Sequence, residues 1–498
     1  MTGEDCRRAF ASWKQRLEAL RTALTVMELD DRQAPSAGTD YRSRQRSVLA
    51  GEYRRVLHDP AAFEVLERLR EDEGLSPAYA REAALYHRQL SRERLIPPEM
   101  YTALEQALSV SRRRWLQAKR EGDFLNYAPC LQAVIDRSRE IASLWQEEGS
   151  VYDRMLNAHQ PGWNRRRYDG FFRELKQGIL PLLEEIRSAP PIPEAFLHRC
   201  YPVEGQRELM EGIRSYLGFA HSWGRLGEGE HPLTSVVCAG DVRFTTKYRE
   251  RDIAQAVFST VHESGHAWHG HNIDPALDGS ILAADVSAGL CESQSRLCEN
   301  HLGRSRAFWQ VHFPAFQHRF PRQLEKVTPE AFYRAVNRVK PTLIRTEADE
   351  VTYPLHILIR YELEEELMEG RLSALALEEA WNERYRTYLG IVPENPAEGV
   401  LQDMHWSWGY FGYFPTYALG SAMAAQFYHT MSRELDVEGL LLGRQYTALM
   451  DWLGEKIHRY GCLYESDEIL QSVTGEGLNP AYYLQWLREK YTSLYGLS

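Results

Sequence analysis

The stretch His262-Glu263-Ser264-Gly265-His266 is the most informative part of this sequence. Successive residues of an α-helix are rotated by about 100°, so two histidines four positions apart lie roughly 40° apart on one helix face. Both imidazoles can then reach one metal ion. Glu263 projects beside them, close enough to deprotonate a metal-held water without itself being a ligand. This pattern is typical of zinc peptidases and predicts a metal centre built on a helix.

Local signals predict that helix and a strand before it. Asp252 stands where its side chain can cap the first turn, and Gln255 follows three residues later. Behind this cap, apolar residues recur at helical spacing: Ile253, Ala256, Val257 and Val261. Residues 241–248 alternate polar residues with β-branched and aromatic ones, and they form the only convincing strand candidate in the sequence.

Helical patterns fill most of the remaining chain. Apolar residues between positions 124 and 144 recur at helical steps, and they are Phe124, Leu131, Val134, Ile135, Ile141 and Leu144. Proline-rich clusters at residues 34–38, 96–98, 188–193 and 392–396 mark turns between helices. We therefore expect an all-α fold, mainly helical with a very small β component.

Composition excludes several classes of protein. The 498 residues are 43% hydrophobic and 26% charged, which is ordinary for a folded globular protein and argues against disorder. Fifty-nine Lys and Arg against 70 Asp and Glu give a formal net charge of −11. An acidic chain repels phosphates, so we expect neither nucleic acid nor a membrane surface as a partner.

Cysteine usage and the start of the chain predict a cytoplasmic location. The first residues are acidic where a secretory signal needs a basic segment, and no apolar run approaches about 18 residues. Seven scattered cysteines are too few for a disulfide framework and suit a reducing compartment. None forms a Cys-x-x-Cys pair, so a thiolate zinc site has no local signature.

A zinc centre needs a third protein ligand, for which we select Glu292. It follows His266 by 26 residues, beyond the turn-rich stretch 272–280, which is enough chain to reverse and begin a second helix. Arg296 and Glu299 follow at helical spacing and can support it. Taken alone, a carboxylate at such a position more often forms a salt bridge on a helix surface than binds a metal. The histidine motif before it makes the metal ligand the favoured interpretation.

Five motifs together resemble the thermostable carboxypeptidase Taq family of metallocarboxypeptidases, family M32. In order, they are Asp241-Val242-Arg243-Phe244-Thr245-Thr246, His262-Glu263-Ser264-Gly265-His266, Glu292-Ser293-Gln294-Ser295-Arg296, Ile344-Arg345-Thr346-Glu347-Ala348-Asp349 and Gly399-Val400-Leu401-Gln402-Asp403-Met404-His405-Trp406. The chain departs from the family at Cys291, where His is usual, and at Cys298, where Trp is usual.

The resemblance implies a single peptidase domain over residues 1–498, with an N-terminal helical lobe of about 1–190 and a catalytic lobe of about 191–498. It implies a deep central substrate groove, a homodimer, and removal of C-terminal amino acids from peptides with a free C-terminus. His262, His266 and Glu292 would hold one divalent ion, zinc by default and cobalt or manganese as alternatives. Glu263 would be the general base.

Further side chains are expected to act on the substrate. A C-terminal carboxylate needs a cation to receive it, and Arg345 is the first choice, with Arg243 second. The alternative for Arg345 is an ion pair with Glu347 or Asp349. Negative charge that builds on the scissile oxygen needs donors, and we expect them among His405, Tyr413 and Tyr417.

Two alternative functions stay open at this point. An oligoendopeptidase or dipeptidase can use the same metal site, and blocking one terminus of the substrate distinguishes these activities. An inactive, metal-stabilised interaction protein is a different class. Retention of Glu263 argues against it, because a structural site has no need of a general base.

Overall fold

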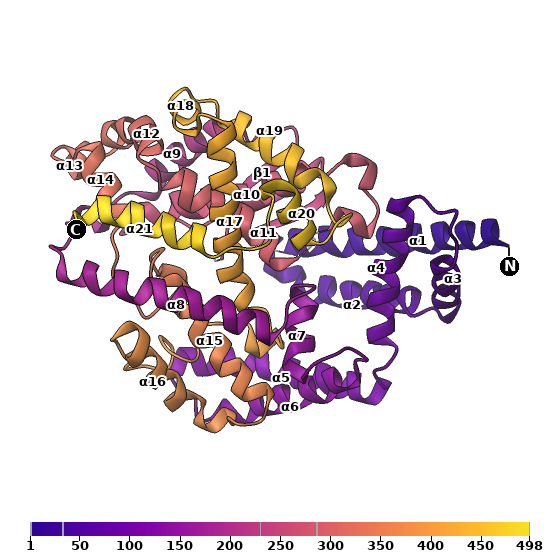
Figure 1. Ribbon diagram of the computed structural model, residues 1–498. Coiled ribbons are helices and arrows are strands. Elements are labelled where there is room, and N and C mark those ends of the chain that lie inside the picture. The colour runs from indigo at the N-terminus through magenta and orange to yellow at the C-terminus, as the bar shows by residue number, and fades with distance from the viewer. Residues whose placement is uncertain (1, 32–33, 230, 285–286, 498) are drawn as a thin grey trace. The chain divides into compact units, whose positions relative to one another are not determined.

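The computed structural model describes residues 2–31, 34–229, 231–284 and 287–497, and helices make up most of them (Figure 1). The β component of this described part is one three-stranded sheet. The predicted all-α fold class with a very small β component is therefore confirmed. No described helix is long and apolar enough to cross a membrane.

Contacts divide the chain into two interleaved units. Unit 1 comprises Met1–Leu95, Cys200–Val286 and Gly439–Glu465, and unit 2 comprises Ile96–Arg199, Ser287–Glu438 and Ser466–Ser498. Helix α18 (Val437–Leu442) contains the boundary between Glu438 and Gly439. The expected lobes of about 1–190 and 191–498, with a groove, are a different partition and stay a prediction.

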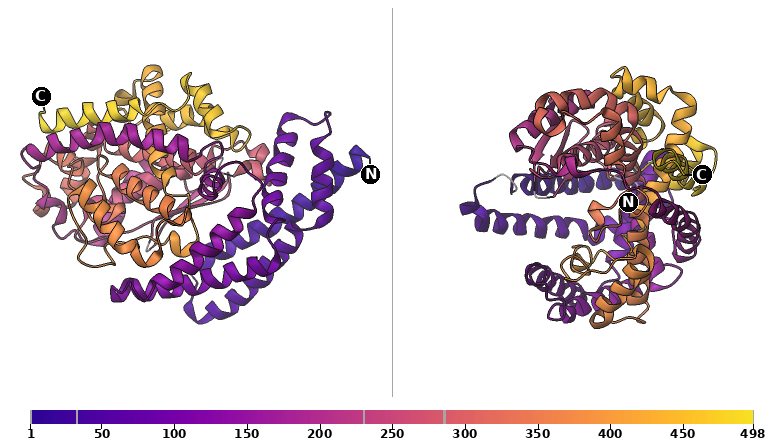
Figure 2. Two further views of the ribbon diagram at one scale, coloured as in Figure 1. Left: turned by 60° about the horizontal axis from the view of Figure 1, so that its bottom comes forward. Right: turned by 90° about the vertical axis from the view of Figure 1, so that its left-hand side faces the viewer.

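In unit 1, the helices α1 to α4 lie side by side (Figure 2). Their shared core includes Phe10, Leu17, Leu66 and Tyr86, which are almost completely buried. The helices of this unit are α1 (Gly3–Asp31), α2 (Thr39–Leu57), α3 (Pro60–Arg70), α4 (Pro77–Glu93), α9 (Val203–Tyr216), α10 (Ile253–His271) and α19 (Tyr446–Lys456).

The sheet of unit 1 has the strand order β1–β3–β2. Strand β3 (Asp241–Thr246) confirms the predicted strand, and it pairs in parallel with β1 (Gly224–Glu228) and antiparallel with β2 (Leu233–Cys238). The expectation of one convincing strand was too narrow: β1 carries two glycines, and β2, with the sequence Leu-Thr-Ser-Val-Val-Cys, has two polar and then two apolar residues side by side, so neither strand alternates along its length. Val242 and Phe244 are buried, and α10 packs on the sheet.

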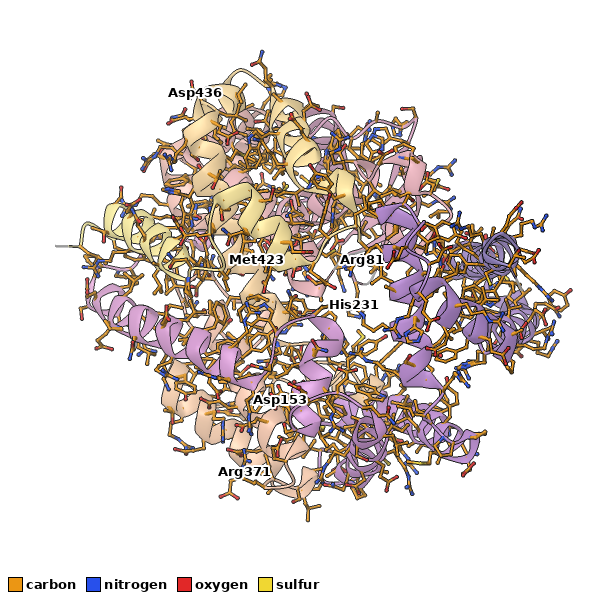
Figure 3. All side chains as sticks on the ribbon, turned by 45° about the vertical axis from the view of Figure 1, so that its right-hand side comes forward. Arg81, Asp153, His231, Arg371, Met423 and Asp436 are labelled. Atoms are coloured by element: carbon orange, nitrogen blue, oxygen red, sulfur yellow. The ribbon has the colours of Figure 1, made fainter. Side chains whose placement is uncertain are left out.

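In unit 2, helix α17 (Pro415–Glu434) packs against α11, α15, α20 and α21. Met423, labelled in Figure 3, lies on α17 and is completely buried. Helices α8 and α21 lie side by side (Figures 1 and 2). The other helices of this unit are α5 (Pro98–Glu121), α6 (Ala128–Leu144), α7 (Val151–His159), α8 (Arg165–Ser188), α11 (Ala288–Arg296), α12 (Arg306–Arg319), α13 (Pro321–Leu324), α14 (Pro329–Val336), α15 (Tyr353–Met368), α16 (Leu377–Leu389), α20 (Ser466–Thr474) and α21 (Ala481–Tyr495).

A π-helix, Leu297–Gly303, continues directly from the end of α11. A π turn holds one residue more than an α turn, and such wide turns are frequent at functional sites. The segment therefore places a wide turn directly after α11, the helix that carries Glu292.

Candidate metal centre and active site

Helix α10 carries the two predicted histidine ligands. Its first turn is capped by Asp252, whose side chain accepts hydrogen bonds from the backbone N–H groups of Ala254 and Gln255, as the sequence predicts. The rings of His262 and His266 lie 5.2 Å apart between centroids. The helix therefore presents both imidazoles on one face.

Helix α11 carries the third predicted ligand, Glu292, which is 6% exposed. Arg296 Nε donates to Glu292 Oε1 at 2.7 Å, and Ser295 Oγ lies 3.1 Å from Oε2. On the neighbouring helix α17, a Cβ atom at Gly420 would lie 2.8 Å from Cβ and 2.9 Å from Cγ of Glu292. The hydrogen bond from Arg296 and the close backbone of Gly420 thus fix the direction of this carboxylate.

His262, His266 and Glu292 each offer one ligand atom, and these atoms all lie within 4.8 Å of one another. In the part of the chain that the structure describes, this is the one group of three or more His, Cys, Asp or Glu side chains so arranged. Two imidazole nitrogens and one carboxylate oxygen form the donor set of a catalytic zinc site that keeps a coordination position open. The residues present therefore fit a divalent metal ion.

Glu263 lies beside this donor set and is 6% exposed. Thr234 on β2 donates a hydrogen bond from Oγ1 to Glu263 Oε2 at 2.6 Å and approaches the Glu263 carbonyl oxygen at 3.1 Å. Sequence reasoning missed Thr234, because nothing local to position 234 indicates that it meets a residue 29 positions later.

Arg345 is buried in unit 2, and its partner is Asp403 rather than Glu347 or Asp349. Its Nε and Nη2 donate to Asp403 Oδ1 at 3.0 and 2.9 Å, and its Nη1 donates to the hydroxyl of Tyr353 at 3.2 Å. Arg360 Nε donates to the other oxygen, Oδ2, at 2.7 Å. The two guanidinium groups hold the pKa of the Asp403 carboxyl well below its usual range. One carboxylate thus faces two arginines.

Arg243, the second choice for the carboxylate receptor, lies on β3 and pairs with Asp241 at 2.7 Å. Alternate residues of a strand face opposite sides of a sheet. Thr234 is paired in register with Phe244, whereas Arg243 is paired with Ser235. Arg243 therefore lies on the sheet face opposite the contact between Thr234 and Glu263.

The structure brings together His405, Tyr413 and Tyr417. His405 Nε2 lies 3.0 Å from the Tyr417 hydroxyl, and the Tyr413 ring lies 5.3 Å from the Tyr417 ring and 5.8 Å from the His405 ring. Burial, with the charge of Arg345 as a second cause, lowers the pKa of His405 to about 3. Burial raises the pKa of Tyr417. Near neutral pH, His405 is therefore uncharged and Tyr417 keeps its proton.

Glu364 on α15 anchors the chain between His405 and Tyr413. This completely buried carboxylate accepts hydrogen bonds from Trp406 Nε1 at 2.7 Å, Tyr152 Oη at 2.9 Å and the backbone N–H of Gly412 at 3.0 Å. Gly412 has φ of 80°, and a Cβ there would lie 2.7 Å from the backbone of Met155. Burial raises the pKa of Glu364 to about 7.

Two cysteines occupy positions near Glu292. Cys291 is half-buried and Cys298, in the π-helix, is completely buried. Neither belongs to the donor group found among the described residues. None of the seven cysteines, all of which lie in the described ranges, forms a disulfide.

Comparison with known proteins covers nearly the whole chain. The family model described as carboxypeptidase Taq (M32) metallopeptidase matches residues 9–491. Carboxypeptidase 1 of Bacillus subtilis is 36% identical over 485 residues, 97% of each chain. Thermostable carboxypeptidase 1 of Thermus thermophilus is 38% identical over 477 residues, 93% of each chain.

Solved structures agree with these sequence matches. The crystal structure of an M32 carboxypeptidase from Deinococcus radiodurans has a TM-score of 0.95 at 33% identity, covering 99% of this chain and 100% of that chain. The structure of a Pyrococcus furiosus carboxypeptidase has a TM-score of 0.95 at 32% identity, covering 99% of each chain.

Proposed function

The chain belongs to the carboxypeptidase Taq (M32) family of metallopeptidases, and we propose that His262, His266 and Glu292 hold the metal ion of this metal-dependent carboxypeptidase. The approach of their ligand atoms to within 4.8 Å is the observation that carries the proposal. Zinc is the preferred ion, because two imidazoles and a carboxylate suit it, and cobalt or manganese are the alternatives.

Glu263 is the general base in this proposal. When bound, the ion supplies a Lewis acid for the scissile carbonyl and lowers the pKa of water. Glu263 takes the proton of the attacking water and passes it to the leaving amine. The hydrogen bond from Thr234 occupies Oε2 of Glu263, which leaves Oε1 to receive the proton.

Arg345 receives the C-terminal carboxylate of the peptide. Three of the five N–H groups of its guanidinium are used by Asp403 and Tyr353, so two are left for a ligand. Arg345 and Arg360 carry two positive charges against one negative charge on Asp403. A buried unpaired charge is costly, and a substrate carboxylate would remove that cost. Arg243 stays the second choice, and its position on the far sheet face favours Arg345.

His405, Tyr413 and Tyr417 serve the scissile oxygen. As negative charge develops there, hydroxyl and imidazole donors that are already oriented stabilise it without reorganisation. The bond between His405 and Tyr417 and the anchoring of the intervening chain by Glu364 support such orientation.

Assembly and location complete the proposal. The substrates are peptides with a free C-terminus, and we propose a homodimer in the cytoplasm, with neither nucleic acid nor membrane as a partner. Seven scattered cysteines, too few for a disulfide framework in a chain of 498 residues, support a reducing compartment. Sedimentation of the purified protein tests the dimer, and a monomer at micromolar concentration would contradict it.

Product masses from a peptide mixture, measured with and without a chelator, test the activity and the site together. We expect ladders shortened from the C-terminus that disappear with the chelator. Glu263→Gln should keep the metal and lose nearly all turnover, whereas Glu292→Ala should lose the metal. Internal fragments, or cleavage that C-terminal amidation leaves unchanged, would favour the endopeptidase instead. Metal retained at full stoichiometry by Glu292→Ala would refute the ligand assignment.

A further inference from the structure

We propose that Tyr353 is a specificity-determining positioning residue, which fixes the separation between Glu292 and Arg345 and so confines cleavage to the last peptide bond. This inference rests on the proposed function, because it takes Glu292 as the metal ligand and Arg345 as the receptor of the terminal carboxylate. The contacts from which it is argued all lie between residues of unit 2.

One face of Tyr353 contacts the residue that holds Glu292. The guanidinium carbon of Arg296 lies 4.1 Å from the centroid of the Tyr353 ring, while Nε of Arg296 donates to Glu292 Oε1 at 2.7 Å. A guanidinium above an aromatic face is attracted by the electron density of the ring. The Tyr353 ring therefore supports the Arg296 guanidinium in the position from which it donates to Glu292.

The hydroxyl of Tyr353 contacts Arg345. It accepts a hydrogen bond from Nη1 of Arg345 at 3.2 Å, and Asp403 holds the other side of the same guanidinium. A single side chain thus touches both arginines, the ring face meeting one cation and the hydroxyl oxygen the other. Phenylalanine would keep the first contact and lose the second, and leucine would lose both.

Tyr353 itself has little freedom to move. Its side chain is 4% exposed, and it is the first residue of α15, where its backbone N–H donates to the carbonyl oxygen of Asp349 at 2.9 Å. Pro354 follows at a position that favours the start of a helix. Tyr353, which contacts both Arg296 and Arg345, is therefore a fixed point of the fold.

A fixed separation explains why one bond is selected. Each additional residue lengthens an extended peptide by about 3.3–3.6 Å. Cleavage one residue further from the C-terminus therefore needs Arg345 to retreat from the metal ligand by roughly that distance. The chain of contacts from Glu292 through Arg296 and Tyr353 to Arg345 opposes such a retreat.

Two variants of Tyr353 test this inference, and Tyr216→Phe is the matched control. Tyr216 is a buried tyrosine of unit 1, whose hydroxyl donates to the Leu441 carbonyl oxygen at 3.0 Å. The measurements are the zinc affinity of the metal-free protein by calorimetric titration, KM for a free-carboxylate peptide, and the fraction of dipeptide among the released products.

Tyr353→Phe should keep the zinc affinity, raise KM about tenfold, and release a measurable fraction of dipeptide, because only the bond to Arg345 is lost. Tyr353→Leu should also weaken zinc binding about tenfold, because the support of Arg296 is lost. Tyr216→Phe should change none of the three quantities. The inference is overturned if both Tyr353 variants match the control, or if Tyr353→Phe weakens zinc binding as much as Tyr353→Leu.

Zinc titration of Glu292→Ala distinguishes a failure of the inference about Tyr353 from a failure of the proposed function. If Glu292 were no ligand, Glu292→Ala would keep full zinc affinity in the same titration. If Glu292→Ala loses zinc while the Tyr353 variants behave like the control, the metal centre stands and the role of Tyr353 is refuted.

Discussion

The hydroxyl of Thr234 lies 2.6 Å from Oε2 of Glu263, so a strand residue holds the carboxylate that we propose as the general base. The same hydroxyl lies 3.1 Å from the carbonyl oxygen of Glu263. Because Thr234 is paired in register with the buried Phe244, its side chain is directed to that face of the sheet. The rotamer of Glu263 is thus controlled from a second element of the fold.

We expect Thr234→Val to lower kcat about tenfold while KM and metal content stay unchanged, because valine has the same shape but no donor for Oε2. Thr234→Ser should recover most of the lost kcat, since it restores the hydroxyl. Steady-state kinetics and elemental analysis of the purified variants check this. A valine variant with wild-type kcat would show that Glu263 needs no such support.

Gly420→Ala should weaken zinc binding roughly ten- to a hundredfold, because the new Cβ would displace the side chain of Glu292. Calorimetric titration of the metal-free variant measures the effect. Gly212→Ala is the control, since Gly212 lies in α9 with no heavy atom within 4 Å of the added Cβ. There we expect unchanged zinc affinity and a gain of about 0.5 kcal/mol in the free energy of unfolding. Equal zinc affinity in both variants would contradict the steric argument.

Arg345→Ala should raise KM for peptides with a free C-terminus far more than for the same peptides ending in an amide, because only the former carry the charge that we propose Arg345 to receive. Parallel kinetics on the two substrate series measure the difference. Arg243→Ala serves as the comparison and should show no such preference. A contrary result would be an equal rise of KM on both substrate series for Arg345→Ala, with a rise confined to the free-carboxylate peptides for Arg243→Ala. Arg243, on the sheet, would then be the receptor of the terminal carboxylate.

The free energy of unfolding should depend on pH through Glu364. Its pKa in the folded protein is about 7, raised by burial from 4.5, so the folded state binds more protons than the unfolded state between these two values. The stabilisation is complete below about pH 4.5 and is lost as the pH rises through 7, by roughly 3 kcal/mol in total.

Glu364→Gln isolates this effect, because other groups titrate equally in both proteins. Denaturant titrations at pH 5 and pH 7.5 should show that the stability advantage of the wild type over the variant shrinks as the pH rises. A difference that stays constant across this range would mean that Glu364 is ionised throughout.

The sequence predicts those parts of the fold and site that depend on neighbours along the chain. The cap at Asp252, the helix that presents His262 and His266, and the strand at residues 241–246 each follow from spacing of a few residues. Arg296 was also expected beside Glu292, because four residues separate them on one helix.

Contacts between distant segments could not be predicted in this way. Arg345 pairs with Asp403, 58 residues further along, whereas the local acids Glu347 and Asp349 were the partners that the sequence offered. Thr234 reaches Glu263 only because the strand order and register bring β2 beside α10. Periodicity within a segment carries no information on the register between segments.

The π-helix Leu297–Gly303 limits how this segment can change in evolution. Each residue of an α-helix turns the backbone by about 100°, and the π turn accommodates one residue more than an α turn. Deleting one residue inside it would restore ordinary winding with nearly the same total rotation, whereas inserting one would rotate α12, the next helix, by about 100° relative to Glu292. The segment can therefore lose one residue without reorienting α12, but it cannot gain one.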